Sequence, residues 1–166
     1  MYKLNSLQDK LNKNMKPVLT ITMLILYSIN LLGQAINQNY DSTLAKSLGA
    51  DNYGMKIYVL VVLKTGSNTF ENKSTTDSLF AGHLSNINKL VEQHKLIVAG
   101  PFVKNDSDFR GIFILNVTTL NEANKLLETD PAIKAKLLKA DLYNWYGSAA
   151  LSQYIKDADK IWKIKP

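Results

Sequence analysis

Two segments of this chain are apolar on both faces when each is read as a β-strand. Residues Lys56–Leu63 read KIYVLVVL, and residues Gly111–Val117 read GIFILNV. Successive side chains of a strand point to opposite faces of the sheet, so each of these strands needs apolar cover on both sides. Helices on one face are therefore not enough, and the second face of the predicted sheet needs a cover of its own.

A helix is predicted between these two strands, from Leu79 to Lys95. At about 100° per residue, one arc of this helix collects its leucine, isoleucine, valine and phenylalanine side chains. His83 falls inside that apolar arc, so its ring faces the core or a pocket and needs a hydrogen-bond partner. Leu96–Ala99 then reads as a short buried strand. Gly100-Pro101 ends it, because proline has no N–H for the ladder.

The rest of the chain completes an α+β pattern. A capping box, Thr119-x-x-Glu122, starts a second helix, and Asp130-Pro131 supplies an N-cap and a first-turn proline for a short helix. The predicted bounds are Asp130–Leu138 for the short helix, Leu142–Tyr146 for a fourth strand and Ser148–Lys163 for a last helix. The order is ferredoxin-like, βαββαβ, with an extra C-terminal helix. Dimerisation of sheet against sheet is the simplest cover for the second face, and the C-terminal helix is the alternative cover.

The N-terminal residues predict export. Four lysines lie within residues 1–16, an apolar run covers residues 18–32, and Gly33-Gln34-Ala35 follows. This is the pattern of a secretory signal peptide over residues 1–35. A membrane anchor is the alternative, but the run is shorter than the ~20 residues that a spanning helix needs. The predicted divisions are signal peptide 1–35, linker 36–54, domain 55–147 and C-terminal helical extension 148–166.

Composition excludes several classes of function. The sequence has no cysteine, which removes disulfides, thiolate nucleophiles and cysteine-ligated metals. The net charge of +6 is not gathered into a basic block, and Arg110 is the only arginine, so nucleic-acid binding is not expected. Two histidines without matching acidic spacing do not predict a metal site. We expect no cofactor, and no stable membrane association once the signal peptide is removed.

Three short motifs resemble the YCII-related (YciI-like) domain family. They are His83-Leu84 on the predicted helix, Ala99-Gly100-Pro101 at the end of the short strand, and Asp130-Pro131. The similarity covers residues 55–147. It implies a small ferredoxin-like domain that forms a dimeric α/β barrel, with a His–Asp pair as its active site. This resemblance assigns the catalytic pair to His83 and Asp130.

The residues themselves leave alternatives open. His83 can act as a general acid or base, since histidine titrates near neutral pH, or it can be a core histidine bonded to a carbonyl. Asp130 can cap its helix with one oxygen and orient the imidazole with the other. Asp106 and Asp108 are the other candidate partners. Candidate ligand-binding residues are Gly100, Pro101 and Tyr58.

The function that these features predict is a cofactor-independent enzyme that transfers a proton on a small molecule by elimination, isomerisation or hydrolysis. The alternative is a non-catalytic dimer that binds a small ligand in the same pocket. A purely structural dimer is the third possibility. A carboxylate within reach of His83 beside an open cavity favours the enzyme, a cavity without that carboxylate favours the binding protein, and no cavity favours the structural dimer.

Export makes the first testable prediction. If residues 1–35 are a signal peptide, the exported protein in a bacterial periplasm or medium should begin at Ile36. Mass spectrometry of the secreted protein measures this directly. An intact Met1 in the membrane fraction would instead support the anchor.

Overall fold

The computed structural model describes residues 37–158 and 160–164. The chain divides into two compact units, residues 1–40 and 41–166, and the folded domain lies in the second. The predicted signal peptide falls outside the described residues. Helix α2 (Ser42–Leu48) lies in the predicted linker, with Asp41 as its N-cap and Gly49 ending it at a left-handed φ of 71°. In the described part of the chain, no helix is long and apolar enough to cross a membrane.

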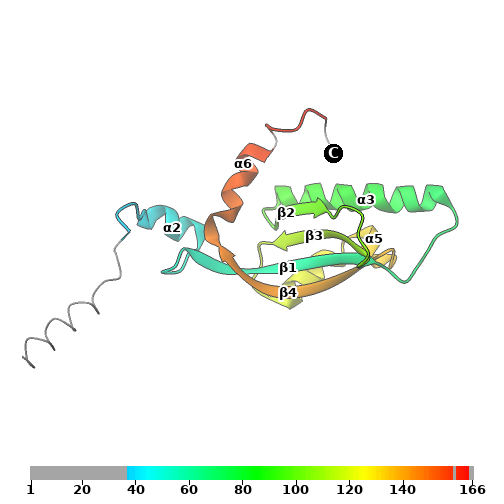
Figure 1. Cartoon of the computed structure of the whole chain (residues 1–166), viewed down its shortest axis with the longest axis horizontal. Helices are drawn as coiled ribbons and strands as arrows, with labels where there is room; N and C mark the ends of the chain where they lie inside the picture. Colours follow the sequence, from blue (N-terminus) through cyan, green and yellow to red (C-terminus); the bar gives the residue numbers. More distant parts are fainter. Residues whose placement is uncertain (1–36, 159, 165–166) are drawn as a thin grey trace, which may run out of the picture. The chain divides into compact units, whose positions relative to one another are not determined.

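Four antiparallel strands form one sheet (Figure 1). The strands are β1 (Met55–Thr65), β2 (Leu96–Pro101), β3 (Phe109–Leu115) and β4 (Leu138–Ser148), and their order across the sheet is β2-β3-β1-β4. The central strand β1 pairs with β4 over its whole length, from Met55 opposite Ser148 to Thr65 opposite Leu138. Strand β4 is therefore more than twice as long as the predicted Leu142–Tyr146, because every residue of β1 has a partner on it.

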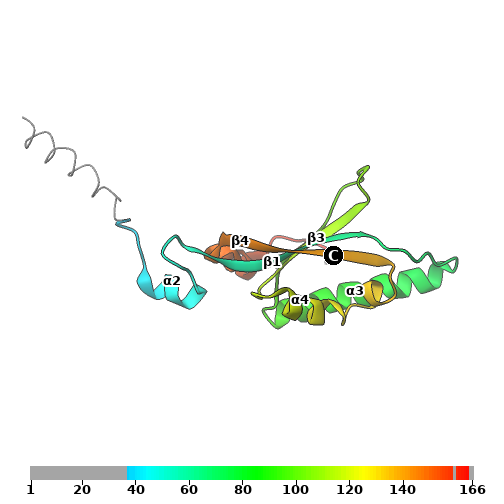
Figure 2. The ribbon, with the colours of Figure 1, turned by 90° about the horizontal axis from the view of Figure 1, so that it is seen from below.

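Three helices connect the strands: α3 (Lys73–Glu92), α4 (Leu120–Leu127) and α5 (Pro131–Lys134). Helices α3 and α4 lie on the same side of the sheet (Figure 2). Asn72 caps α3 by accepting a hydrogen bond from Ser74 N at 2.9 Å. The Thr119 hydroxyl accepts from Glu122 N as predicted, whereas the Glu122 carboxylate pairs with Lys95 at 2.9 Å. This arrangement is an α+β fold whose strand order is compatible with the predicted ferredoxin-like fold.

The main core lies between the sheet and α3–α4. Alternate residues of β1, Val59, Val61 and Leu63, point into it, and all are almost completely buried. Leu90 of α3 and Phe113 of β3 meet them there. Each such side chain contributes about 1.5–3 kcal/mol when it is removed from water. The same face therefore fixes α3, and with it His83, against the sheet.

The opposite face of the sheet has a smaller cluster. Tyr58, Ile97 and Ile114 are buried there, with Leu60, Val98 and Trp145 packed beside them. The cover comes from the segment after β4, whose Leu151 and Ile155 pack against this cluster. The prediction that β1 needs apolar cover on both faces is thus confirmed.

The C-terminal segment differs from the single helix predicted over Ser148–Lys163. A 3-10 helix, η2 (Ala149–Tyr154), leads into one turn of α-helix, α6 (Ile155–Ala158). The Tyr154 hydroxyl donates to the Ile97 carbonyl at 2.5 Å and ties the segment to β2. Beyond α6, Ile161 and Ile164 are more than four-fifths exposed, so no packing holds a longer helix in place.

Candidate functional site

Helix α3 places His83 on its buried face. The His83 residue is 9% exposed, although it carries a titratable ring. The Phe113 ring of β3 stacks on the imidazole at a centroid distance of 5.8 Å, and the Phe80 ring approaches edge-on at 6.4 Å. These two aromatic rings fix the plane of the imidazole, so its two nitrogens have defined directions.

One nitrogen of that ring bonds to a buried carboxylate. His83 Nδ1 lies 2.7 Å from Asp130 Oδ2, and Asp130 is completely buried. The other oxygen, Oδ1, accepts from the backbone N–H groups of Ala132 at 2.9 Å and Ile133 at 3.2 Å. The predicted contact between Asp130 and His83 is confirmed, and one carboxylate both caps α5 and holds the imidazole.

The hydrogen-bond pattern defines the tautomer of His83. An ionised carboxylate only accepts hydrogen bonds, so Nδ1 must carry the proton in the bond to Asp130. In the neutral ring, Nε2 then has a free lone pair. Nε2 has no hydrogen-bond partner among the described residues. Among these residues, Asn86 Nδ2 is the only side-chain nitrogen or oxygen that is both completely buried and without a hydrogen-bond partner, so the unpaired Nε2 is not completely buried. The basic nitrogen is therefore accessible.

A cavity of about 590 Å³ adjoins this ring. His83, Phe80 and Ile87 of α3 form one wall, and the ends of the central strands form the other. Gly100 and Pro101, both predicted from sequence, line the cavity at the end of β2. The wall is otherwise largely apolar, and such a volume suits a small organic molecule.

The structure does not bring the other candidates to this cavity. Tyr58 lies on the opposite face of the sheet, completely buried, with its hydroxyl donating to the Ser148 carbonyl at 2.8 Å. Burial raises the pKa of this hydroxyl, so it stays a neutral, structural donor. Asp106 and Asp108 are exposed in the β2–β3 loop, and His94 is exposed just after α3. Within the described ranges, no cluster of acidic residues and histidines can hold a metal ion.

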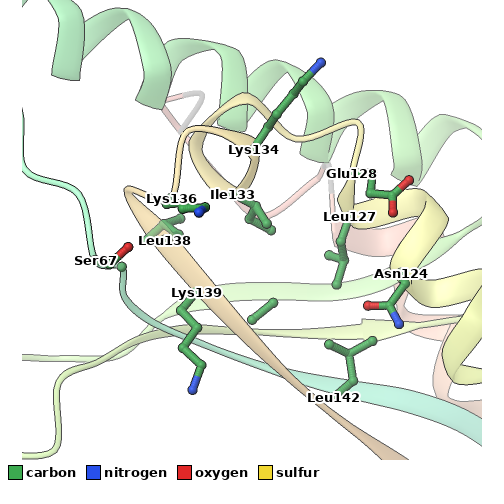
Figure 3. Close-up of a pocket in the computed structure, with 12 residues that line it drawn as sticks. Ser67, Asn124, Leu127, Glu128, Ile133, Lys134, Lys136, Leu138, Lys139 and Leu142 are labelled. Carbon is green, nitrogen blue, oxygen red and sulfur yellow. The ribbon is translucent and has the colours of Figure 1, made fainter.

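A second cavity, of about 640 Å³, lies beside α4, α5 and β4. Apolar side chains such as Leu127 and Ile133 form its wall, and three lysines border it. Figure 3 shows the Lys134 and Lys139 side chains directed away from it, in different directions. Because the charges of Lys134 and Lys139 do not converge on one point, we place the candidate site at the His83 cavity instead.

Close packing of α3 on α5 brings the pair together. Gly82 precedes His83, and a Cβ atom at Gly82 would lie 2.8 Å from Pro131 Cγ. Real Cβ atoms do not approach a neighbour so closely, so only glycine admits the proline ring at this position. Pro131 follows Asp130 directly, so the contact of Pro131 with Gly82 also determines how closely the Asp130 carboxylate approaches the imidazole. The family resemblance identified the two partners, but the sequence analysis missed Gly82, although a glycine beside a buried histidine is visible in the sequence.

A second buried polar residue of α3, Asn86, was also missed. Its Oδ1 lies 2.9 Å from Thr129 Oγ1, which is itself 2.6 Å from the Leu126 carbonyl. A hydroxyl has one proton to donate, and the shorter bond to Leu126 uses it. Turning the Asn86 amide over lets Nδ2 donate to Thr129 Oγ1, which supplies the partner that Nδ2 otherwise lacks.

Replacing Gly82 tests this packing. Gly82→Ala gains about 1 kcal/mol of helix propensity, but overpacking against Pro131 costs about 1–3 kcal/mol. We expect a net loss of stability of about 1 kcal/mol in chemical denaturation and a longer Nδ1–Oδ2 distance in a crystal structure. Ser85→Ala, at an exposed position of α3, is the control and should be neutral or slightly stabilising. A more stable Gly82→Ala protein with an unchanged distance would contradict the role given to Gly82.

Comparison with known proteins agrees with the motifs. The model of the YCII-related domain family matches residues 55–144, more than half of the chain. No curated protein matches the sequence. Among solved structures, the 5-chloro-2-hydroxyhydroquinone dehydrochlorinase of Burkholderia phenoliruptrix AC1100, in complex with 2,5-dihydroxybenzoquinone, aligns with a TM-score of 0.38 and 21% identity, covering 52% of this chain and 92% of that one. The family match shows that the chain belongs to the YCII-related domain family.

Proposed function

We propose that this protein is a cofactor-independent enzyme that transfers a proton on a small organic molecule bound beside His83. One observation carries the proposal: His83 Nδ1 is bonded to the buried Asp130 at 2.7 Å, while the ring also lines a cavity of about 590 Å³. A base oriented by a carboxylate and facing a largely apolar pocket is the arrangement that general acid–base catalysis needs.

The chemistry follows from the tautomer. Asp130 holds the proton on Nδ1, so His83 Nε2 can accept a proton from a C–H or O–H group of the substrate, or from water. The imidazolium that forms is stabilised by the Asp130 charge. It can return its proton to a leaving group in an elimination or hydrolysis, or to another atom of the substrate in an isomerisation. Proton transfer of this kind contributes about 10²–10⁴-fold to a rate.

A non-catalytic binding protein is the second candidate. The cavity is mostly apolar, and an apolar cavity of this size binds small molecules without chemistry. The buried carboxylate on His83 favours the enzyme, because a binding protein needs an imidazole donor or acceptor but no charge behind it. The cavity beside His83 disfavours a purely structural histidine, because a histidine with only a structural role needs no open space next to its ring.

We further propose that this protein is exported and forms a homodimer joined through the second face of its sheet. The support is that Val62 and Ile112 are only half-buried on this face, outside the cluster that η2 and α6 cover. Their register positions are adjacent, since Val62 pairs with Ile112. A second copy of the sheet is the simplest cover for them.

Substitution of the pair tests the enzyme. His83→Gln keeps an N–H group that can donate to Asp130 Oδ2 but removes the basic nitrogen. Asp130→Asn presents an N–H donor to Nδ1, which favours the tautomer with the proton on Nε2 and removes the free lone pair there. Each change should lower turnover by about 10²–10⁴-fold. The assay is NMR-detected loss of substrate across a panel of small lactones and substituted aromatic molecules. Thermal unfolding of each variant shows that the domain remains folded.

The control for this experiment is His94→Asn, which removes the other histidine at an exposed position. Its φ of 55° is one that asparagine tolerates. This variant should keep full turnover. Turnover that survives His83→Gln would contradict the enzyme proposal, and a wild-type protein that binds panel members without converting any would support the binding protein.

Sedimentation tests the dimer. At micromolar concentration the mature protein should have twice the mass of one chain, and Val62→Lys should shift it toward the monomer by placing a charge in the contact. Val103→Lys is the control, since Val103 is 85% exposed in the β2–β3 loop. A wild-type monomer would contradict the proposal and leave η2–α6 as the sole cover of that face.

A further inference from the structure

Arg110, the only arginine of the chain, lines the same cavity as His83. It is also the only residue with a fixed charge in that lining, since Asp130 lies behind the imidazole and does not reach the cavity. The cavity therefore has an apolar body, a basic nitrogen from α3 and a positive charge from β3.

A β-bulge directs Arg110 toward this cavity. Strands β1 and β3 pair Leu63 with Gly111 but Lys64 with Phe109, so Arg110 is the extra residue of β3 at the register shift. An extra residue re-aims a side chain relative to regular alternation. Phe109 accordingly packs against Lys64, at 5.3 Å from Nζ to the ring centroid, while Arg110 meets Thr65 and the cavity.

The backbone around the bulge is held on both sides. The Asn105 side chain bonds to both Phe109 N, at 3.2 Å, and Phe109 O, at 2.9 Å. The Arg110 carbonyl accepts from Phe102 N at 2.9 Å, and the Asp108 carbonyl accepts from Thr65 N at 3.2 Å. These bonds fix the position from which the arginine side chain starts, so its direction is built into the fold.

The guanidinium group is anchored by one edge and open at the other. Arg110 Nε donates to Thr65 Oγ1 at 2.7 Å. In residues 37–158 and 160–164, its two Nη groups have no hydrogen-bond partner, and Arg110 forms no ion pair. Two parallel N–H groups of a guanidinium match the two oxygens of a carboxylate. A group held in this way at the mouth of an apolar cavity is pre-organised for an anionic ligand.

We propose that Arg110 binds the carboxylate of the ligand, so that the molecule bound beside His83 is a small carboxylic acid with an apolar, ring-sized body. The carboxylate pairs with the Nη groups at the rim, and the apolar body lies between Phe80 and Phe113. This inference names the substrate class of the proposed enzyme and rests on the same cavity, but it does not depend on catalysis.

A pair of probes tests the proposal. Benzoate and benzamide have the same ring and nearly the same shape, and they differ in charge. Wild-type protein, titrated with each probe and followed by NMR, should bind benzoate about tenfold more tightly than benzamide. Arg110→Gln should weaken benzoate by about tenfold and leave benzamide unchanged. Arg110→Lys keeps the charge but not the fork, and should give an intermediate value.

Two further variants separate the possible failures. Lys104→Gln removes a positive charge from the same β2–β3 loop outside the cavity lining, and it should leave both affinities unchanged. His83→Gln, which is expected to lower turnover by about 10²–10⁴-fold, should keep the preference for benzoate. Absence of benzoate binding, equal affinity for the two probes, or an unchanged benzoate affinity in Arg110→Gln would overturn the proposal. If the protein prefers benzoate but converts no carboxylic acid, the inference about Arg110 is upheld. Only the proposal that the protein is an enzyme is then contradicted.

Discussion

The buried carboxylate of Asp130 is the group on which the rest of the site depends. A completely buried charge costs several kcal/mol unless hydrogen bonds replace its water. Three donors replace it here: two backbone N–H groups at the start of α5, and the Nδ1–H of His83 from α3. The carboxylate thus ties two helices together, and removing any one donor leaves it under-bonded. The fold can keep this charge only if α3 and α5 stay in register with each other.

That register explains features that look unrelated along the chain. Gly82 and Pro131 are 49 residues apart in number, yet the missing Cβ of one seats the ring of the other. Glycine inside a helix costs about 1 kcal/mol relative to alanine, and the bond from His83 Nδ1 to Asp130 Oδ2 that this close approach permits offsets the loss. The Phe113 ring stacked on the imidazole completes the arrangement from the sheet. The low helix propensity of Gly82 is therefore accepted in exchange for the hydrogen bond between His83 and Asp130.

The sequence predicted the dyad better than the cavity around it. The position of His83 on the apolar arc of its helix and the Asp130-Pro131 cap are local patterns, but they left Asp106 and Asp108 open as partners, and the resemblance to the YCII-related family singled out Asp130. Tyr58 was misplaced because alternation shows which strand residues share a face but not which face bears the cavity. The bulge at Arg110 depends on the register between β1 and β3. The 3-10 helix η2 depends on the contact of Tyr154 with β2. Neither feature is visible in local periodicity.

The two nitrogens of His83 separate stability from reactivity. Nδ1 belongs to the fold, because Asp130 would otherwise be an under-bonded buried charge. Nε2 contributes nothing to that bond and is accessible beside a cavity that Arg110 also lines. A histidine that served structure alone would gain stability by burying its second nitrogen against a carbonyl or hydroxyl. The fold instead leaves this nitrogen without a partner in the described chain, on the side where a ligand can reach it, and this arrangement is the physical basis for our proposal of proton transfer at the site.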